Sequence, residues 1–231
     1  MTKKKIIELL NNKTALKQQV FENTHQAFLQ IKEILKAVAE EYNKELDTDE
    51  DLIEFRDTSE MLSGLRVSGD VLVFYMHSNI FDFDREHDVR KTKYLKNDPM
   101  AGYSGVINIY NFLSDSFKYE RKEDLGYLIG RIFINKNRHY FVEGKRQEDS
   151  AVPHFGKKVL NKNALKKIIE TAIAYSLQFD LLVPPYDNVK MTTVEHISMK
   201  KYQGQLKTGK RLGFSFRSDD VKGEAPKYTG G

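Results

Sequence analysis

The sequence predicts an α+β protein with an N-terminal helical segment, a mainly antiparallel sheet of roughly five to seven strands, and a C-terminal helix packed on one face of the sheet. The first observation is a β-hairpin between Leu125 and Glu143, where apolar and β-branched residues flank the polar break 135–138. The second is that apolar residues recur every three or four positions in segments on both sides of it, which is the period of an amphipathic helix.

The composition limits the chemistry that this chain can use. Its 231 residues, 40% of them hydrophobic, are enough for one large buried core. Cysteine is absent, which excludes disulfides, thiolate nucleophiles, zinc–thiolate sites and iron–sulfur clusters. A net charge of +4 does not by itself indicate a nucleic-acid-binding protein, although nucleic acid stays among the partners considered.

The N-terminus begins like a signal peptide, with three lysines, but the apolar run after them stops at Leu10. No apolar stretch approaches the roughly 20 residues that a membrane-spanning helix needs. We therefore expect a cytoplasmic protein with no membrane partner.

Residues 1–46 are predicted to be a helical segment, with a short helix before Asn11 and a longer one from Thr14 to Leu46. The longer helix has an apolar stripe formed by Phe28, Ile31, Leu35, Val38 and Tyr42. Such a stripe is usually part of a core, and the alternative is the contact surface of a homodimer. Acidic residues from Asp47 onward should follow the helix, because they oppose the negative end of its dipole.

An α+β domain is expected over residues 47–217, with residues 218–231 as a flexible tail. Besides the hairpin, its strands are predicted near residues 53–58, 62–67, 71–77, 106–113, 189–199 and 212–217, with a short helix over residues 110–117 as the alternative to the end of the fourth of these. A helix is predicted over residues 162–180, with Asn161 or Asn163 as its N-cap. Residues 80–98 are a long loop, and loops of this length commonly carry function.

The first candidate site lies in this loop. If residues 80–86 are extended, then Asp82, Asp84 and Glu86 project from one face, with His77 and His87 nearby. Three carboxylates could hold Mg²⁺, Mn²⁺ or Ca²⁺, and a histidine would favour a transition metal. The alternative is a polar edge strand whose charges prevent aggregation.

The second candidate site is the triplet Glu143-Gly144-Lys145, with Asp124 at the start of the hairpin. In outline this pattern resembles the PD-(D/E)xK nucleases over residues 124–145. The resemblance implies that Asp124 and Glu143 hold a divalent metal, while Lys145 lies beside the scissile phosphate. The sequence departs from the pattern at Gly144, a poor strand residue, which would place Glu143 and Lys145 in a turn.

The third candidate site is a group of lysines around the start of the C-terminal helix. It consists of Lys157, Lys158, Lys162, Lys166 and Lys167. Because lysines oppose the dipole at a helix N-terminus, an anion such as a phosphate or a nucleic-acid backbone would explain them. The alternative is an ordinary solvated surface.

The expected architecture is similar to that of GAF and PAS domains, which implies a sensory or ligand-binding role. The leading functional hypothesis is a non-enzymatic protein that binds a partner protein or an anionic ligand, as a homodimer if the stripe is a contact surface. The alternative is a metal-dependent phosphodiesterase or nuclease. The cofactor is unknown, and a divalent metal is expected only under this alternative.

Overall fold

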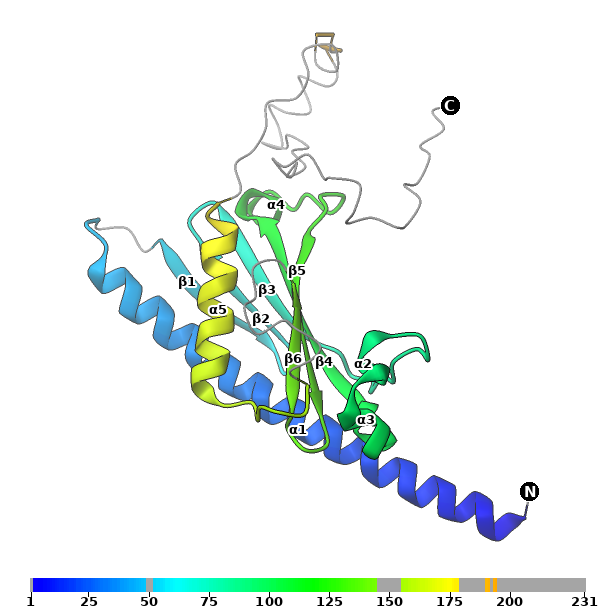
Figure 1. Cartoon of the computed structure of the whole chain (residues 1–231). Coiled ribbons are helices and arrows are strands. Elements are labelled where there is room, and N and C mark those ends of the chain that lie inside the picture. Colours follow the sequence, from blue (N-terminus) through cyan, green and yellow to red (C-terminus); the bar gives the residue numbers. More distant parts are fainter. Residues whose placement is uncertain (1, 49–51, 145–154, 179–189, 192, 195–231) are drawn as a thin grey trace.

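The computed structural model describes residues 2–48, 52–144, 155–178, 190, 191, 193 and 194, and in it a six-stranded sheet packs against helices (Figure 1). The strands are β1 (Ile53–Ser59), β2 (Leu62–Val67), β3 (Asp70–Met76), β4 (Ser104–Leu113), β5 (Tyr127–Asn135) and β6 (Tyr140–Gly144). Each strand pairs antiparallel with the next one in sequence, so the sheet is a simple meander. The α+β prediction is confirmed, as is the central hairpin, now β5 and β6. The strands predicted after residue 188 fall almost wholly outside the described residues, as does the predicted tail.

The two long helices agree with the prediction except at one place, and two short helices occur within residues 80–98, which were predicted to be a loop. The helices are α1 (Lys3–Glu45), α2 (Asp88–Lys91), α3 (Lys93–Asn97), α4 (Ser114–Lys118) and α5 (Lys162–Ser176), with a 3-10 turn, η1 (Pro99–Gly102). The predicted break at Asn11 is wrong, because α1 runs through it as one helix of 43 residues. Asparagine costs well under about 1 kcal/mol in a helix relative to alanine, and α1 contains no proline or glycine.

Asn161 is the N-cap of α5, where its side chain accepts a hydrogen bond of 2.9 Å from the Ala164 N–H. None of the described helices is both long and apolar enough to cross a membrane.

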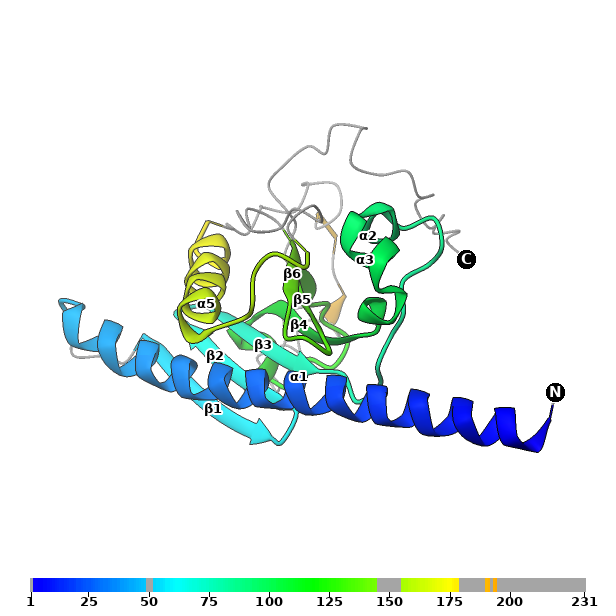
Figure 2. The same cartoon turned by 60° about the horizontal axis from the view of Figure 1, so that its bottom comes forward.

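One face of the sheet is covered by α1 and α5 (Figures 1 and 2). Alternate residues of β3, Leu72, Phe74 and Met76, point toward these helices and are completely buried. The stripe of α1 packs on them: its members Phe28, Ile31, Leu35 and Val38 are 0% exposed, and Tyr42 is half-buried against the same core. The stripe is therefore core in the single chain, and a homodimer through it would require α1 to leave the sheet.

The other face, which we call the open face, is covered at one end only. The loop between β3 and β4 folds back over it with α2, α3 and η1, and a second buried cluster forms there. The cluster comprises Val89, Leu95, Val106, Phe133, Phe141 and Phe155. Val106, Phe133 and Phe141 are neighbours across the strands, which places them on the same face. Toward β3, the open face is uncovered by the described residues, and Tyr75 there is 36% exposed.

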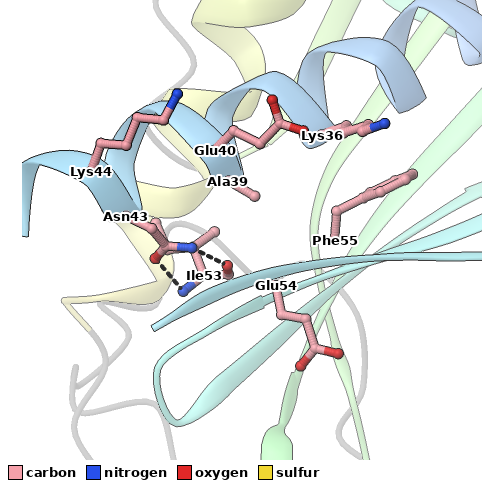
Figure 3. Close-up of a pocket in the computed structure, with 8 residues that line it drawn as sticks. All are labelled: Lys36, Ala39, Glu40, Asn43, Lys44, Ile53, Glu54 and Phe55. Carbon is pink, nitrogen blue, oxygen red and sulfur yellow. Dashed lines mark hydrogen bonds between the residues drawn. The ribbon is translucent and has the colours of Figure 1, made fainter. Parts of the chain in front are cut away.

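The free edge of the sheet at β1 is protected by α1. The Asn43 side chain donates to the Ile53 carbonyl at 2.6 Å and accepts from the Ile53 N–H at 3.0 Å, as a neighbouring strand would (Figure 3). Farther along, the Lys32 ammonium binds the Ser59 carbonyl at 2.7 Å and the Asp57 carboxylate at 2.6 Å. These side chains limit pairing of the edge with another chain.

Replacing Asn43 by alanine should therefore destabilise the fold. The change leaves the N–H and the carbonyl of Ile53 without their partner, which should lower the free energy of unfolding by about 1–3 kcal/mol in urea titrations. Asn12→Ala is the matched control, because Asn12 lies on an exposed stretch of the same helix. It should change the free energy of unfolding by less than about 0.5 kcal/mol. Equal losses in the two variants would contradict the role given to Asn43.

The turn between β5 and β6 is joined to α3 by the Tyr94 hydroxyl. The side-chain amides of Asn135 and Asn137 donate to this oxygen at 3.0 and 2.9 Å, and His139 Nδ1 lies 2.8 Å from it. A phenol oxygen accepts two hydrogen bonds, so its own hydrogen is left to donate to His139 Nδ1. His139 must be neutral for this, in agreement with its pKa, which burial lowers from the ordinary value of 6.5.

Acidification should weaken the fold through His139. The unfolded chain takes up this proton near pH 6.5 and the folded protein only at a lower pH, so the unfolded state binds more protons between the two values. The contribution to stability is complete above pH 6.5 and is lost as the pH falls through the lowered pKa. Urea unfolding at a series of pH values should show this loss, and His139→Gln should show a shallower pH dependence. Parallel pH profiles for the two proteins would refute this assignment.

Candidate functional site

A pocket of about 310 Å³ lies on the open face, beside the loop that covers one end of it. We call it the open-face pocket. Its walls come from the loop after β3 and from β4, β5 and β6, segments that are far apart in the sequence. The lining residues are His77, Phe81, Asp82, Phe83, Asp84, His87, Val106, Asn108, Arg131, Phe133 and Glu143.

The strand register brings the polar residues of the sheet together in this pocket. Asn108 of β4 is paired with Arg131 of β5, which is paired with Glu143 of β6. Paired residues point to the same face, so these three side chains form a row across the sheet. The apolar side of the pocket is Phe133, on which Phe83 packs with ring centroids 5.3 Å apart. This contact holds the loop against the sheet.

The two histidines of the pocket have a fixed tautomer in their neutral form. His77 Nδ1 accepts the N–H of Asn79 at 3.0 Å, and His87 Nδ1 accepts the N–H of Val89 at 3.2 Å as the N-cap of α2. An imidazole nitrogen that accepts a backbone N–H carries no hydrogen, so in each ring the hydrogen is on Nε2. Neither Nε2 then has a lone pair with which to take a proton or bind a metal. Both histidines are hydrogen-bond donors.

The carboxylates of the pocket are engaged with positive groups or with the backbone. Glu143 Oε2 accepts two hydrogen bonds from the Arg131 guanidinium, one of them from Nε at 3.0 Å, and Glu143 Oε1 lies 3.6 Å from His87 Nε2. The Asp82 carboxylate is paired with the guanidinium of Arg90. Asp84 accepts the N–H of Glu86 at 2.9 Å. The pocket is thus lined by three carboxylates and one guanidinium group, that of Arg131, and even with Arg90, which pairs with Asp82 from outside the lining, the formal charge is one negative unit when the histidines are neutral.

The carboxylates of the first candidate site do not lie on one extended strand. Only Phe81 makes a bridge to β4, at Ser104, and the chain turns at residues 85 and 86. The reason is local, because Asp82 and Asp84 accept hydrogen bonds from the N–H groups of Phe83 and Glu86 and so stabilise turns. Asp82 and Asp84 line the pocket, whereas Glu86 does not. Among the described residues, no three His, Asp or Glu side chains are grouped so as to hold a metal ion.

Asp124 and Glu143 of the second candidate site belong to separate networks. The Asp124 side chain, 5% exposed, accepts a hydrogen bond of 2.7 Å from the Ser116 hydroxyl and lies 3.6 Å from the Arg121 guanidinium. Glu143 is paired with Arg131, and both Glu143 and Gly144 are strand residues rather than parts of a turn. Lys145 lies outside the described residues. The structure therefore does not bring Asp124 to the Glu143 carboxylate.

Two lysines of the third candidate site have an anion within the chain. Lys162 pairs with Glu33 at 2.8 Å and Lys166 with Glu41 at 2.9 Å, so α5 is joined to α1 by ion pairs. Lys158 and Lys167 are engaged as well, and Lys157 lines a hollow beside Tyr94. The glutamates of α1 thus explain why lysines occur near the N-terminus of α5, against its dipole.

Three residues of the open-face pocket, Asn108, Arg131 and Phe133, were not among the site residues predicted from the sequence. A signal for Arg131 was present, because a hairpin that turns at residues 136–138 places Arg131 opposite Glu143. Nothing in the sequence connects the loop carrying His77 and His87 to this hairpin. Their meeting depends on the packing of Phe83 on Phe133, which is a tertiary contact.

The groove between α1 and β1 is a second hollow, of about 490 Å³ (Figure 3). Its polar residues Lys36, Glu40 and Lys44 lie along the exposed side of α1 and do not converge on one point. The open-face pocket, where donors and acceptors from four segments converge, is the better candidate.

No protein-family model, curated protein or solved structure matches this chain. The resemblances to the nucleases and to GAF and PAS domains thus gain no support from relatives, and the site itself carries the functional argument.

Mg²⁺ or Mn²⁺ at millimolar concentration should leave the melting temperature unchanged, because Asp124 and Glu143 already have positively charged partners. Thermal melts with and without metal test this, since a metal bound only by the folded state must raise the melting temperature. Glu143→Ala should melt at the same temperature with and without metal. A metal-dependent rise in the wild type that Glu143→Ala removes would contradict this expectation and favour the nuclease resemblance.

Proposed function

We propose that the protein is a non-enzymatic, cytoplasmic binding protein whose open-face pocket takes a small polar ligand that is neutral or positively charged. The observation that carries the proposal is the pocket itself, where imidazole, amide and guanidinium donors and three carboxylates surround phenylalanine rings. Ligand sites typically combine an apolar wall with a few convergent polar groups. A volume of about 310 Å³ suits a small molecule.

In their neutral form the two histidines supply hydrogen-bond donors rather than a general base, which supports a binding role. General-base catalysis needs a side chain that can accept a proton from the substrate. His77 and His87 offer N–H groups instead, because the backbone N–H of Asn79 and of Val89 occupies each Nδ1. The carboxylates of Asp82 and Glu143 are held in ion pairs.

The charge of the pocket favours a neutral or cationic ligand. Its three carboxylates outnumber the guanidinium groups of Arg131, in the lining, and of Arg90, beside Asp82, so an anion would be repelled while the histidines are neutral. An amine would be attracted to Asp84, the carboxylate for which the structure shows no guanidinium partner, and could lie against Phe81 or Phe83. This differs from the anionic ligand expected from the lysines, two of which are paired with α1.

Thermal melts in the presence of a panel of nucleosides, free amino acids and small aromatic amines test the proposal. At a concentration of about 100 times its Kd, a ligand stabilises the folded state by about 2.7 kcal/mol, which corresponds to a rise in melting temperature of roughly 5–10 °C. At least one member of the panel should produce such a rise. The double variant His77→Ala/Asn108→Ala should lose it, because two of the donors are gone.

Lys36→Ala is the matched control, since Lys36 lines the groove between α1 and β1 and not the open-face pocket. It should keep the full rise in melting temperature. If no member stabilises the wild type, or if the rise survives in the double variant, the proposal is wrong.

A further inference from the structure

The N-terminal part of α1, residues 3–19, extends past the sheet, and we call it the arm (Figures 1 and 2). All its residues are exposed except Leu16, which is half-buried. Hydrogen bonds to the rest of the fold begin at the end of the arm, where the side-chain amides of Gln19 and then Asn23 donate to the carbonyl of Lys136, in the turn after β5, at 3.3 and 2.8 Å. As far as Ala15, the arm is therefore a helix whose side chains are all exposed in the described part of the chain.

The arm carries the whole formal net charge of the protein. Residues 1–19 contain five lysines and one glutamate, which gives a charge of +4. The chain has 37 basic and 33 acidic residues in all, so residues 20–231 hold 32 of each sign and are formally neutral. A partner for the arm should therefore be anionic.

The first turns of the arm also expose aliphatic side chains. Ile6, Ile7, Leu9 and Leu10 are 44%, 48%, 42% and 60% exposed. At 3.6 residues per turn they lie within an arc of about 160° of the helix surface. Farther along the helix, Lys13 and Lys17 point to the same side as these four residues. The exposed apolar surface is therefore limited to residues 6–10, which we call the aliphatic tip, and positive charge follows it along the arm.

We propose that the arm binds the surface of a membrane that contains anionic lipids. The aliphatic tip would enter the interface between headgroups and acyl chains, and the lysines would lie at the lipid phosphates. A nucleic acid offers phosphates but no apolar layer for Ile6, Ile7, Leu9 and Leu10. A second arm offers an apolar surface but brings +4 against +4. We expected no membrane partner because a spanning segment is lacking, but binding at the surface does not require one.

The test is sedimentation of the full chain with vesicles. Vesicles that mix phosphatidylcholine with phosphatidylglycerol should bind the protein, whereas vesicles of phosphatidylcholine alone should bind it weakly or not at all. Binding should weaken when the salt rises from about 0.05 M to about 0.5 M, because salt screens the lysines from the phosphates.

Variants of the arm separate the apolar from the charged contribution. Lys4→Gln/Lys5→Gln should weaken binding by roughly 10- to 30-fold. Ile6→Asn/Leu10→Asn keeps the charge and should also weaken binding by at least about tenfold. Lys36→Gln/Lys44→Gln is the matched control, because it removes two exposed lysines of the same helix outside the arm, and it should bind like the wild type.

Two results would overturn the proposal. One is equal sedimentation with both kinds of vesicle. The other is that Ile6→Asn/Leu10→Asn binds the anionic vesicles as tightly as the wild type does, while the wild type binds duplex DNA equally tightly. The arm would then recognise any polyanion. The exposed arm makes few contacts with the body, so these variants should keep the fold, and circular dichroism checks this. None of them touches the open-face pocket, so this test is independent of the proposed ligand.

Discussion

The burial of the α1 stripe against the sheet is the contact on which the rest of the structure depends. Phe28, Ile31, Leu35 and Val38 are completely buried, and each contributes about 1.5–3 kcal/mol when removed from water. A meander has two faces to cover, and this stripe, together with α5, covers only one of them. The open face is therefore available for the loop after β3 and for the pocket beside it.

The pocket exists because the covering loop is anchored at an aromatic cluster and at the same time carries polar groups. Phe83 packs on Phe133 and Phe141, with ring centroids 5.3 and 5.7 Å apart, so its neighbours Asp82 and Asp84 come to the rim of the sheet. The backbone of the same loop fixes the histidine tautomers. The loop that Phe83 anchors is thus the same loop that carries the polar groups of the open-face pocket. A change at Phe83 would therefore affect both the fold and the binding of a ligand.

Most charged residues that were prominent in the sequence are used in pairs within the fold. Lys162 and Lys166 reach Glu33 and Glu41 across about 125 to 129 residues of sequence. Glu143 meets Arg131 through the register of the hairpin. The charges of the arm are different, because none of its lysines has such a partner among the described residues. This contrast separates charges that join elements of the fold from charges that are open to an external partner.

The sequence by itself determined the secondary structure, because that depends on local periodicity and on the ends of elements. The stripe of α1, the cap at Asn161, the end of α1 before Asp47 and the hairpin of β5 and β6 were all predictable, whereas the continuity of α1 through Asn11 and the short helices α2 and α3 in the loop after β3 were not. The tertiary structure alone decided which charges are neutralised and which residues share a pocket. His77, Asn108 and Glu143 meet through strand register and the packing of Phe83, and such long-range contacts leave no period in a single sequence.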